Sequence, residues 1–233
     1  VVGYPLGVLY GTGSKTNADG SFDLNSNGFP QITSSPMVLG DPNPDWRGGI
    51  SLNMRYKKFR LNAVLEHSQG GEFSPRTLWV LRRFGTTQET ANRLTLDQSL
   101  VNYRGTTVPA GTTVRGNIED FGGGPVLLDE NWYRTGIGGG FGDNQAYNFS
   151  IADATWTKLR DLSLSYVLDT PVIKNIGLND VILTFTGRDL ININNVDGID
   201  PEINTKGVSV AQGVEYFTNP QTKGFLFSLT INY

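Results

Sequence analysis

Cysteine is absent from this 233-residue sequence, and histidine occurs only once, at position 67. Without cysteine the chain can form neither a disulfide nor a thiolate metal site. A zinc site or a catalytic triad would have to use His67, which we expect near the end of a strand instead. No phosphate-loop or nucleophile-elbow motif is complete. We therefore nominate no catalytic residue, no metal ligand and no cofactor, and we do not expect an enzyme.

Long apolar runs and charge of one sign are also missing. The longest apolar run, Leu78 to Leu81, is far shorter than the ~20 residues that a membrane helix needs. The 19 basic and 22 acidic residues give a net charge of −3. The basic residues are dispersed, which argues against a nucleic-acid partner. The 29 glycines predict a loop-rich chain, yet with the 11 prolines they stay below the content of a disordered one.

What the sequence does contain is strict alternation of apolar and polar residues, the pattern of strands with one apolar face. It predicts an all-β, antiparallel fold. A sixth, weaker strand is possible around 4–10. The five clear runs lie at 46–56, 58–67, 156–168, 181–188 and 225–233.

The predicted connections alternate between short and long. Residues 56–58 and 169–178 form short connections, whereas 69–154 and 191–221 form long ones that we expect to be irregular, apart from a short element at 78–83. Such one-sided asymmetry is typical of outer-membrane barrels, which have short periplasmic turns and long extracellular loops. A soluble β-sandwich that binds glycans would give the same alternation and remains the alternative.

The long loops hold the candidate contact residues. Exposed aromatic side chains often stack on sugars or on partner proteins, and the candidates here are Trp132, Tyr133, Phe141 and Tyr147. Packing within the loop is an equally good interpretation. Pairs of loop acids, such as Asp129 with Glu130 or Asp200 with Glu202, could serve a glycosidase or hold calcium. Their spacing matches no complete ligand set, so we favour simple solvation.

Several ordered motifs carry a resemblance to a known family. The segments 40–46 (GDPNPDW), 48–49 and 69–71, the strand 156–166 (WTKLRDLSLSY) followed by Pro171, the segment 187–190 (GRDL), and 200–202 (DPE) occur in order. Together with a last strand that ends on Tyr233, they resemble the C-terminal part of SusC/RagA-like TonB-dependent outer-membrane transporters. Asp189 stands where that family usually has Asn.

The resemblance implies import of a bulky nutrient, an oligosaccharide or a peptide, through a plugged barrel of about 22 strands in the outer membrane of a Gram-negative bacterium. It also implies two protein partners, namely TonB, acting on an N-terminal region, and a SusD-like surface lipoprotein. Residues 1–233 would then be the C-terminal portion of the barrel domain, its last five to six strands, without plug or signal peptide. Five or six strands cannot close a barrel in lipid, so we expect the chain to need the remaining barrel and plug of a longer polypeptide.

Placing the last strand in a barrel makes 69–154 and 191–221 extracellular and 56–58 and 169–178 periplasmic. Strand parity then puts Trp156, Lys158 and Arg160 on the lipid side, and we place them at the membrane interface, together with Tyr56 and Tyr166. A bulge that reverses the face is the alternative. The terminal residues Phe225, Phe227, Leu229, Ile231 and Tyr233 are expected to face lipid and to act as the signal for barrel assembly.

Overall fold

The computed structural model describes residues 1–135, 138, 146–205 and 212–233, and within them the chain forms two compact units. We call them the sheet unit and the loop unit. The sheet unit consists of Pro44–Gly71, Ala154–Glu202 and Asn219–Tyr233. The loop unit consists of Val1–Asn43, Glu72–Asp153 and Ile203–Thr218. The predicted single portion of a barrel with irregular loops is therefore divided into two units that each have their own structure.

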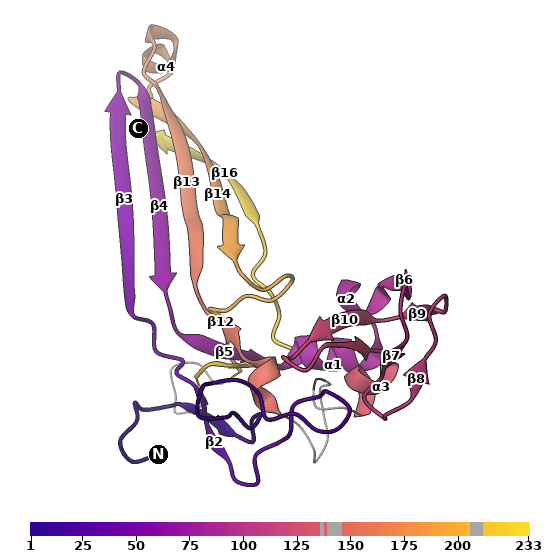
Figure 1. Cartoon of the computed structure of the whole chain (residues 1–233). Helices are drawn as coiled ribbons and strands as arrows, with labels where there is room; N and C mark the ends of the chain where they lie inside the picture. Colours follow the sequence, from indigo (N-terminus) through magenta and orange to yellow (C-terminus); the bar gives the residue numbers. More distant parts are fainter. Residues whose placement is uncertain (136–137, 139–145, 206–211) are drawn as a thin grey trace. The chain divides into compact units, whose positions relative to one another are not determined.

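The sheet unit is built on one antiparallel sheet of five long strands (Figure 1). Their order is β16-β14-β13-β4-β3, so strands that follow one another in this set also lie side by side. All five strands predicted from alternation are confirmed. The strands are β3 (Trp46–Tyr56), β4 (Phe59–Gln69), β13 (Trp156–Leu168), β14 (Asp180–Asn194) and β16 (Gly224–Asn232).

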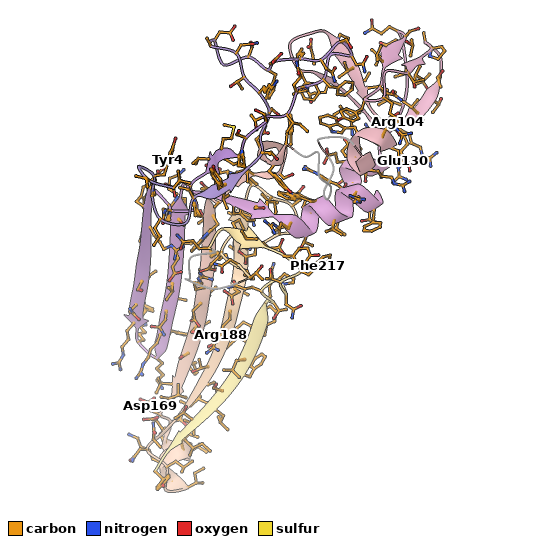
Figure 2. The ribbon with its side chains drawn as sticks, turned by 90° about the horizontal axis from the view of Figure 1, so that it is seen from below. Tyr4, Arg104, Glu130, Asp169, Arg188 and Phe217 are labelled. Carbon is orange, nitrogen blue, oxygen red and sulfur yellow. The ribbon has the colours of Figure 1, made fainter. Side chains whose placement is uncertain are left out.

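The short connections lie together at one end of this sheet. Tyr56 pairs with Phe59 around a two-residue turn in which Lys57 adopts a left-handed conformation with φ of 53°. Helix α4 (Pro171–Asn175) fills the connection between β13 and β14. An ion pair between Lys58 and Asp169 joins the two connections, and Figure 2 shows Asp169 at this end of the sheet, with Arg188 farther along it. The predicted alternation of short and long connections is thus confirmed.

The loop unit contains short elements, so the expectation of irregular long loops is wrong. The possible strand at 4–10 is also wrong as a sixth strand of the large sheet, because β1 pairs with β2 in this unit. The short element expected at 78–83 is confirmed as α1. The strands are β1 (Leu9–Gly11), β2 (Met37–Gly40), β5 (Glu72–Pro75), β6 (Arg93–Thr95), β7 (Leu100–Val101), β8 (Thr107–Val108), β9 (Thr113–Arg115), β10 (Asn117–Asp120), β11 (Pro125–Leu128), β12 (Ala152–Asp153) and β15 (Val214–Glu215). The helices are α1 (Arg76–Phe84), α2 (Gln88–Ala91), α3 (Glu130–Thr135) and the 3₁₀ turn η1 (Tyr147–Ser150).

An aromatic core holds the loop unit together. Phe29 is fully buried, and its ring lies 5.5 Å from Trp132 and 5.4 Å from Tyr103, centroid to centroid. A second, smaller cluster forms around Leu96, Leu100 and Leu127. Burying such large side chains is worth about 1.5–3 kcal/mol each. This burial explains how a segment rich in glycine and short of long strands still folds.

Candidate membrane-facing sheet and its ionic cluster

One face of the five-stranded sheet is apolar and exposed across every strand. Phe185 of β14 lies between Leu164 of β13 and Phe227 of β16 in the pairing register. Phe227 is 81% exposed and Ile50 of β3 is 69% exposed. The other exposed apolar residues of this face are Trp46, Leu52, Met54, Tyr56, Phe59, Leu65, Leu183, Ile191, Ile193, Phe225, Leu229 and Ile231. A β-sandwich would bury this face under a second sheet, whereas here its side chains remain uncovered.

The opposite face is polar, and its side chains bond to one another between strands. Ser165 and Thr184 share a hydrogen bond of 2.8 Å, and Ser163 and Thr186 share one of 3.0 Å. The Ser163 hydroxyl also donates to Asp161 at 2.6 Å. Such a face suits water or packed polar groups, so the sheet is two-sided throughout its length.

A β-bulge in β13 changes which face its first residues occupy. Leu159 pairs with Leu65 while Asp161 pairs with Val64, which leaves Arg160 as the extra residue. The pairing partner of Lys158 is therefore Glu66, on the polar face. The placement of Trp156 and Lys158 on the apolar side is wrong, because simple alternation does not survive a bulge. The alternative of a bulge that reverses the face is the one that the structure adopts.

Past the bulge, Lys158 lies at the centre of what we call the ionic cluster: Lys158, Arg160, Glu66, Asp200, Glu202 and Gln221. The Lys158 ammonium donates to both oxygens of Asp200 at 2.8 and 2.7 Å and to Glu202 at 2.7 Å. A weaker contact of 3.2 Å reaches the side-chain oxygen of Gln221. Lys158 is 1% exposed and Asp200 6%, so this pair is shielded from water. A buried lysine persists only when paired in this way.

Arg160 completes the ionic cluster at its more exposed side. Its guanidinium donates to Glu66 at 2.9 Å and also bonds to Glu202. A longer ion pair of 3.6 Å reaches Asp189. The indole ring of Trp156, 2% exposed, lies with its centroid 5.1 Å from both the Lys158 ammonium and the Arg160 guanidinium. This range allows cation–π attraction, so the tryptophan helps to hold both cations in place.

The electrostatics of Glu202 follow from these contacts. Burial raises the pKa of the Glu202 carboxyl, but hydrogen bonds from Arg160 and Lys158 outweigh burial and leave the pKa below its ordinary value. The backbone N–H of Glu202 donates to Asp200 at 3.0 Å, which closes a tight local turn. The 200–202 segment is therefore fastened to β13 by charge. The expectation that these acids are simply solvated is wrong for Asp200 and Glu202, because their oxygens accept hydrogen bonds from Lys158 and Arg160.

The two tyrosines assigned to the membrane interface do lie on the apolar face, at the turn end of the sheet. Tyr56 pairs with Phe59, and Phe59 pairs with Tyr166, with 4.8 Å between the last two ring centroids. Three neighbouring strands thus place aromatic rings in one row. Their interface role stays a prediction, as does the assembly signal assigned to Phe225, Phe227, Leu229, Ile231 and Tyr233.

The aromatic residues nominated for ligand contact have different surroundings from those expected. Trp132 is 4% and Tyr133 5% exposed, because both belong to the core of the loop unit. For this pair the interpretation of packing within the loop is confirmed, and exposed rings are not found. Burial and the nearby Glu89 carboxylate raise the pKa of the Tyr133 hydroxyl well above its ordinary value. Tyr147 is half-buried against Trp79, at 5.7 Å between centroids. Phe141 lies outside the described residues.

His67 lies near the end of β4, as predicted. Its ring nitrogen Nδ1 is 2.8 Å from the Thr157 hydroxyl, and its ring packs 4.8 Å from that of Trp46, centroid to centroid. Within the part of the chain that the structure describes, no three histidine or acidic side chains cluster as metal ligands. In the same residues, no helix has the length and apolar character that a membrane crossing requires.

Comparison with solved structures identifies the class of fold. The RagAB peptide importer in its "open-open" state matches 99% of this chain with a TM-score of 0.54 at 13% identity. The same importer in its "closed-closed" state matches 97% with a TM-score of 0.53 at 15% identity. A further structure, the RagAB peptide transporter, gives a TM-score of 0.55 at 16% identity over 97% of the chain. Each match spans 23% of the solved chain. These likenesses show a shared fold.

Among curated proteins, the chain is similar to TonB-dependent receptor P3 of Formosa agariphila, with 25% identity over 216 residues. That match covers 91% of this chain but only 18% of the relative. No family model matches the chain. The resemblance to SusC/RagA-like TonB-dependent transporters that the sequence motifs indicated is thereby confirmed.

Strand parity alone put Lys158 on the wrong face and left the bulge as an alternative, although one signal in its favour was present. Asp189 adopts a left-handed conformation with φ of 50° opposite the bulged part of β13. Aspartate and asparagine are the side chains that tolerate this conformation best, so Asp189, in the segment where the related family has Asn, marks an irregularity. The side chain of Leu190 lies against Gly187, where an added Cβ would come within 2.8 Å of it. The motif therefore encodes a local backbone shape.

Proposed function

We propose that this chain forms part of the barrel wall of a TonB-dependent outer-membrane transporter, in which the apolar face of the sheet contacts lipid. The observation that carries the proposal is the continuous exposed apolar face of all five long strands. A soluble protein rarely leaves so large an apolar surface uncovered. In the bilayer the same surface is the favourable one, and the polar face turns to the interior of the barrel.

The two open edges of the sheet support the proposal that these strands belong to a longer polypeptide. Among the described residues, β3 and β16 each pair with one strand of the sheet and leave their other edge open. Open backbone edges are too costly in lipid, so neighbouring strands must complete the wall. We assign these strands, the plug and the region that contacts TonB to further parts of the same polypeptide. The similarity to a receptor of which the chain covers 18% agrees with this assignment.

The transported solute, in this proposal, is a bulky nutrient, an oligosaccharide or a peptide, and a SusD-like lipoprotein covers the extracellular mouth. The similarity to a peptide importer supports this class of solute without selecting within it. In this topology the connections 69–154 and 191–221 are extracellular, and the connections 56–58 and 169–178 are periplasmic. Transport of this kind needs no catalytic side chain in the chain, so we propose a transporter part and no enzyme.

The row of Tyr56, Phe59 and Tyr166 suits the periplasmic interface, where aromatic rings are enriched. The ionic cluster suits the extracellular end, where it would fasten the start of the 195–223 connection to the barrel wall. In this arrangement Lys158 and Arg160 bind protein carboxylates, so they need no lipid phosphate. The charges that strand parity placed in lipid are thereby neutralised inside the protein.

A pair of adjacent substitutions tests the lipid contact. Phe227 is on the apolar face near the middle of β16, and Ser228 is its neighbour on the polar face. We expect Phe227→Arg to lower the unfolding free energy in lipid by about 2–4 kcal/mol and to reduce the amount recovered from the outer membrane. Ser228→Arg, as the matched control, should have little effect because an arginine there faces the barrel interior.

Two results would contradict the contact between the apolar face and lipid. In a soluble protein both positions are simply exposed, and surface substitutions stay within about 0.5 kcal/mol. If Phe227→Arg and Ser228→Arg behave alike, or if the native polypeptide is recovered in the soluble fraction without detergent, the lipid-facing assignment is wrong. An intact mass of the native polypeptide near the 25.5 kDa of this chain would separately contradict the longer transporter.

A further inference from the structure

The loop unit contains a cleft of about 390 Å³ next to the start of α1, which we call the Ser74 cleft. Tyr10 of β1, Ser74 of β5 and Tyr147 of η1 line it together with Arg76 and Trp79, which are one turn apart on α1. Gln212 closes one side. The volume lies within the range of small-ligand sites, and the walls combine aromatic rings with polar groups.

Two residues that line this cleft each have a buried polar side-chain atom without a hydrogen-bond partner. These atoms are the hydroxyl of Ser74, a residue 3% exposed, and the indole N–H of Trp79, a residue 4% exposed. They are the only such side-chain atoms in the described part of the chain. A buried polar group left unpaired costs about 1–3 kcal/mol, and unpaired groups in native proteins are exceptional. Both residues line the Ser74 cleft, which indicates that a group bound there completes their hydrogen bonding.

The remaining polar groups of the cleft agree with this interpretation. Within the described residues, the Arg76 guanidinium and the hydroxyls of Tyr10 and Tyr147 make no hydrogen bond or ion pair with protein. Arg76 and Trp79 can only donate hydrogen bonds, and no acidic side chain lines the cleft. The nearby Glu215 is already engaged by Thr77 and Thr218. The cleft therefore has an excess of donors and one uncompensated positive charge.

An arginine-rich cleft elsewhere in the loop unit is a weaker candidate, because protein groups already use its arginines. Arg82 pairs with Glu89 at 2.8 Å, and Arg134 pairs with Glu130 at 2.5 Å. Arg115 donates to the backbone carbonyls of Gly85 and Thr90, both at 2.5 Å. Its cations are neutralised or fix the backbone, whereas Arg76, the one cation that lines the Ser74 cleft, has no protein partner among the described residues.

We propose that the Ser74 cleft binds a carboxylate group of the transported oligomer, with Arg76 as its charge partner and with Ser74 and Trp79 as additional donors. Guanidinium is the side chain best suited to a carboxylate, since it offers two parallel donors. The exposed ring of Tyr10 supplies an apolar surface beside the acid group. Because the Ser74 and Trp79 atoms lie below the cleft surface, binding requires a small movement of the wall. This inference rests on the proposed transport function, whose solute it specifies.

Binding can be measured by calorimetry on the native polypeptide, purified in detergent. Two acids cover the two sources of carboxylate: trigalacturonate for a saccharide and N-acetyl-trialanine for a peptide. Their neutral partners are the methyl ester and the C-terminal amide of the acetylated peptide. We expect one of the two acids to bind at least tenfold more tightly than its neutral partner, and the preferred pair identifies the source. Failure of both acids to bind, or equal binding of acid and neutral forms, would overturn the proposal.

Variants then tie binding to the cleft. Arg76→Gln should weaken binding of the acid about ten- to a hundredfold, since a hydrogen bond to a charged group is lost. Arg104→Gln is the matched control, because Arg104 is an exposed arginine of the same unit outside the cleft (Figure 2). Wild-type affinity in Arg76→Gln would refute the role of Arg76.

Trp79→Phe separates binding from folding. It keeps a ring but removes the unpaired N–H, so it should weaken binding several-fold without lowering the melting temperature of the free protein. A tryptophan that serves only the core would show the reverse, a lower melting temperature and unchanged binding. The transport proposal fails on different data, namely absence of the polypeptide from the outer-membrane fraction, so the two failures are distinguishable.

Discussion

Removing the Lys158 ammonium should destabilise the protein far more than removing a lysine from an exposed ion pair. Lys158 supplies the bonds to both oxygens of Asp200, at 2.8 and 2.7 Å, and the side chains of the two residues are 1% and 4% exposed. In Lys158→Met, Asp200 would keep one donor among the described contacts, the N–H of Glu202. Breaking a buried pair by removing one partner costs about 3–5 kcal/mol, because the other charge stays buried.

A second substitution, at Asp200, should restore most of the stability that Lys158→Met loses. In the double variant Lys158→Met, Asp200→Leu, both buried charges are gone, and replacement of a whole buried pair by apolar groups is often neutral. Glu202 would keep its bond to Arg160. We therefore expect the double variant to regain most of the lost stability, with a coupling energy of about 2 kcal/mol or more in the mutant cycle.

Stability is measured by urea unfolding in detergent and is monitored by tryptophan fluorescence. Trp156 is a local reporter, because its ring centroid lies 5.1 Å from the Lys158 ammonium. Lys58→Met is the control, because Lys58 pairs with Asp169 at the exposed turn end, where the side chains are 41% and 48% exposed. It should change stability little. A loss below about 1 kcal/mol in Lys158→Met, or a double variant as unstable as the sum of the single ones, would refute the assignment of a buried, charge-held cluster.

Three further predictions follow from local geometry. Gly213→Ala should cost clearly more than the ~1–2 kcal/mol of a left-handed alanine, since its Cβ would lie 2.5 Å from the Cβ of Pro42, part of a rigid ring. Gly177→Ala, with a similar φ and open space, should cost only that amount, and equal losses in urea unfolding would contradict the steric argument. The pKa of Glu202 is lowered in the folded state. Ionised Glu202 therefore contributes its full share to the free energy of unfolding above the unfolded-state pKa of about 4.3, and this share is lost as the pH falls through the folded-state pKa. Between pH 6 and pH 3, the free energy of unfolding should thus fall less steeply with pH in Glu202→Gln than in the wild type. An equal slope in the two proteins would refute this role of Glu202. Trp132→Ala should cost about 3–5 kcal/mol as a core truncation, and a melting temperature equal to wild type would show that the ring is not in the core.

The five long strands were predictable because their signal is local. Each strand has one apolar and one polar face, so residues such as Phe225, Phe227 and Leu229 recur with a period of two. The short connections were equally readable, since a turn at Lys57 or a helix started by Pro171 depends on neighbouring residues alone.

The loop unit was much less predictable. Its elements are only two to nine residues long, too short to establish a period. Trp132 and Tyr133 looked like exposed loop aromatics, and only packing against partners such as Phe29, far away in sequence, decided that they are buried. The Ser74 cleft likewise draws its walls from residues 10, 74 and 147, which no spacing in the sequence connects.

By itself, the sequence determined the strands, their two-sided character and the resemblance to a transporter family, because alternation and ordered motifs are properties of neighbouring residues. Only the tertiary structure decided where the charged side chains lie and with which groups they pair. A single extra residue at Arg160 reverses the face of Lys158, and the partners that neutralise it, Asp200 and Glu202, come from 42 and 44 positions away. The pairing of strands and the burial of charge depend on which distant segments meet in space.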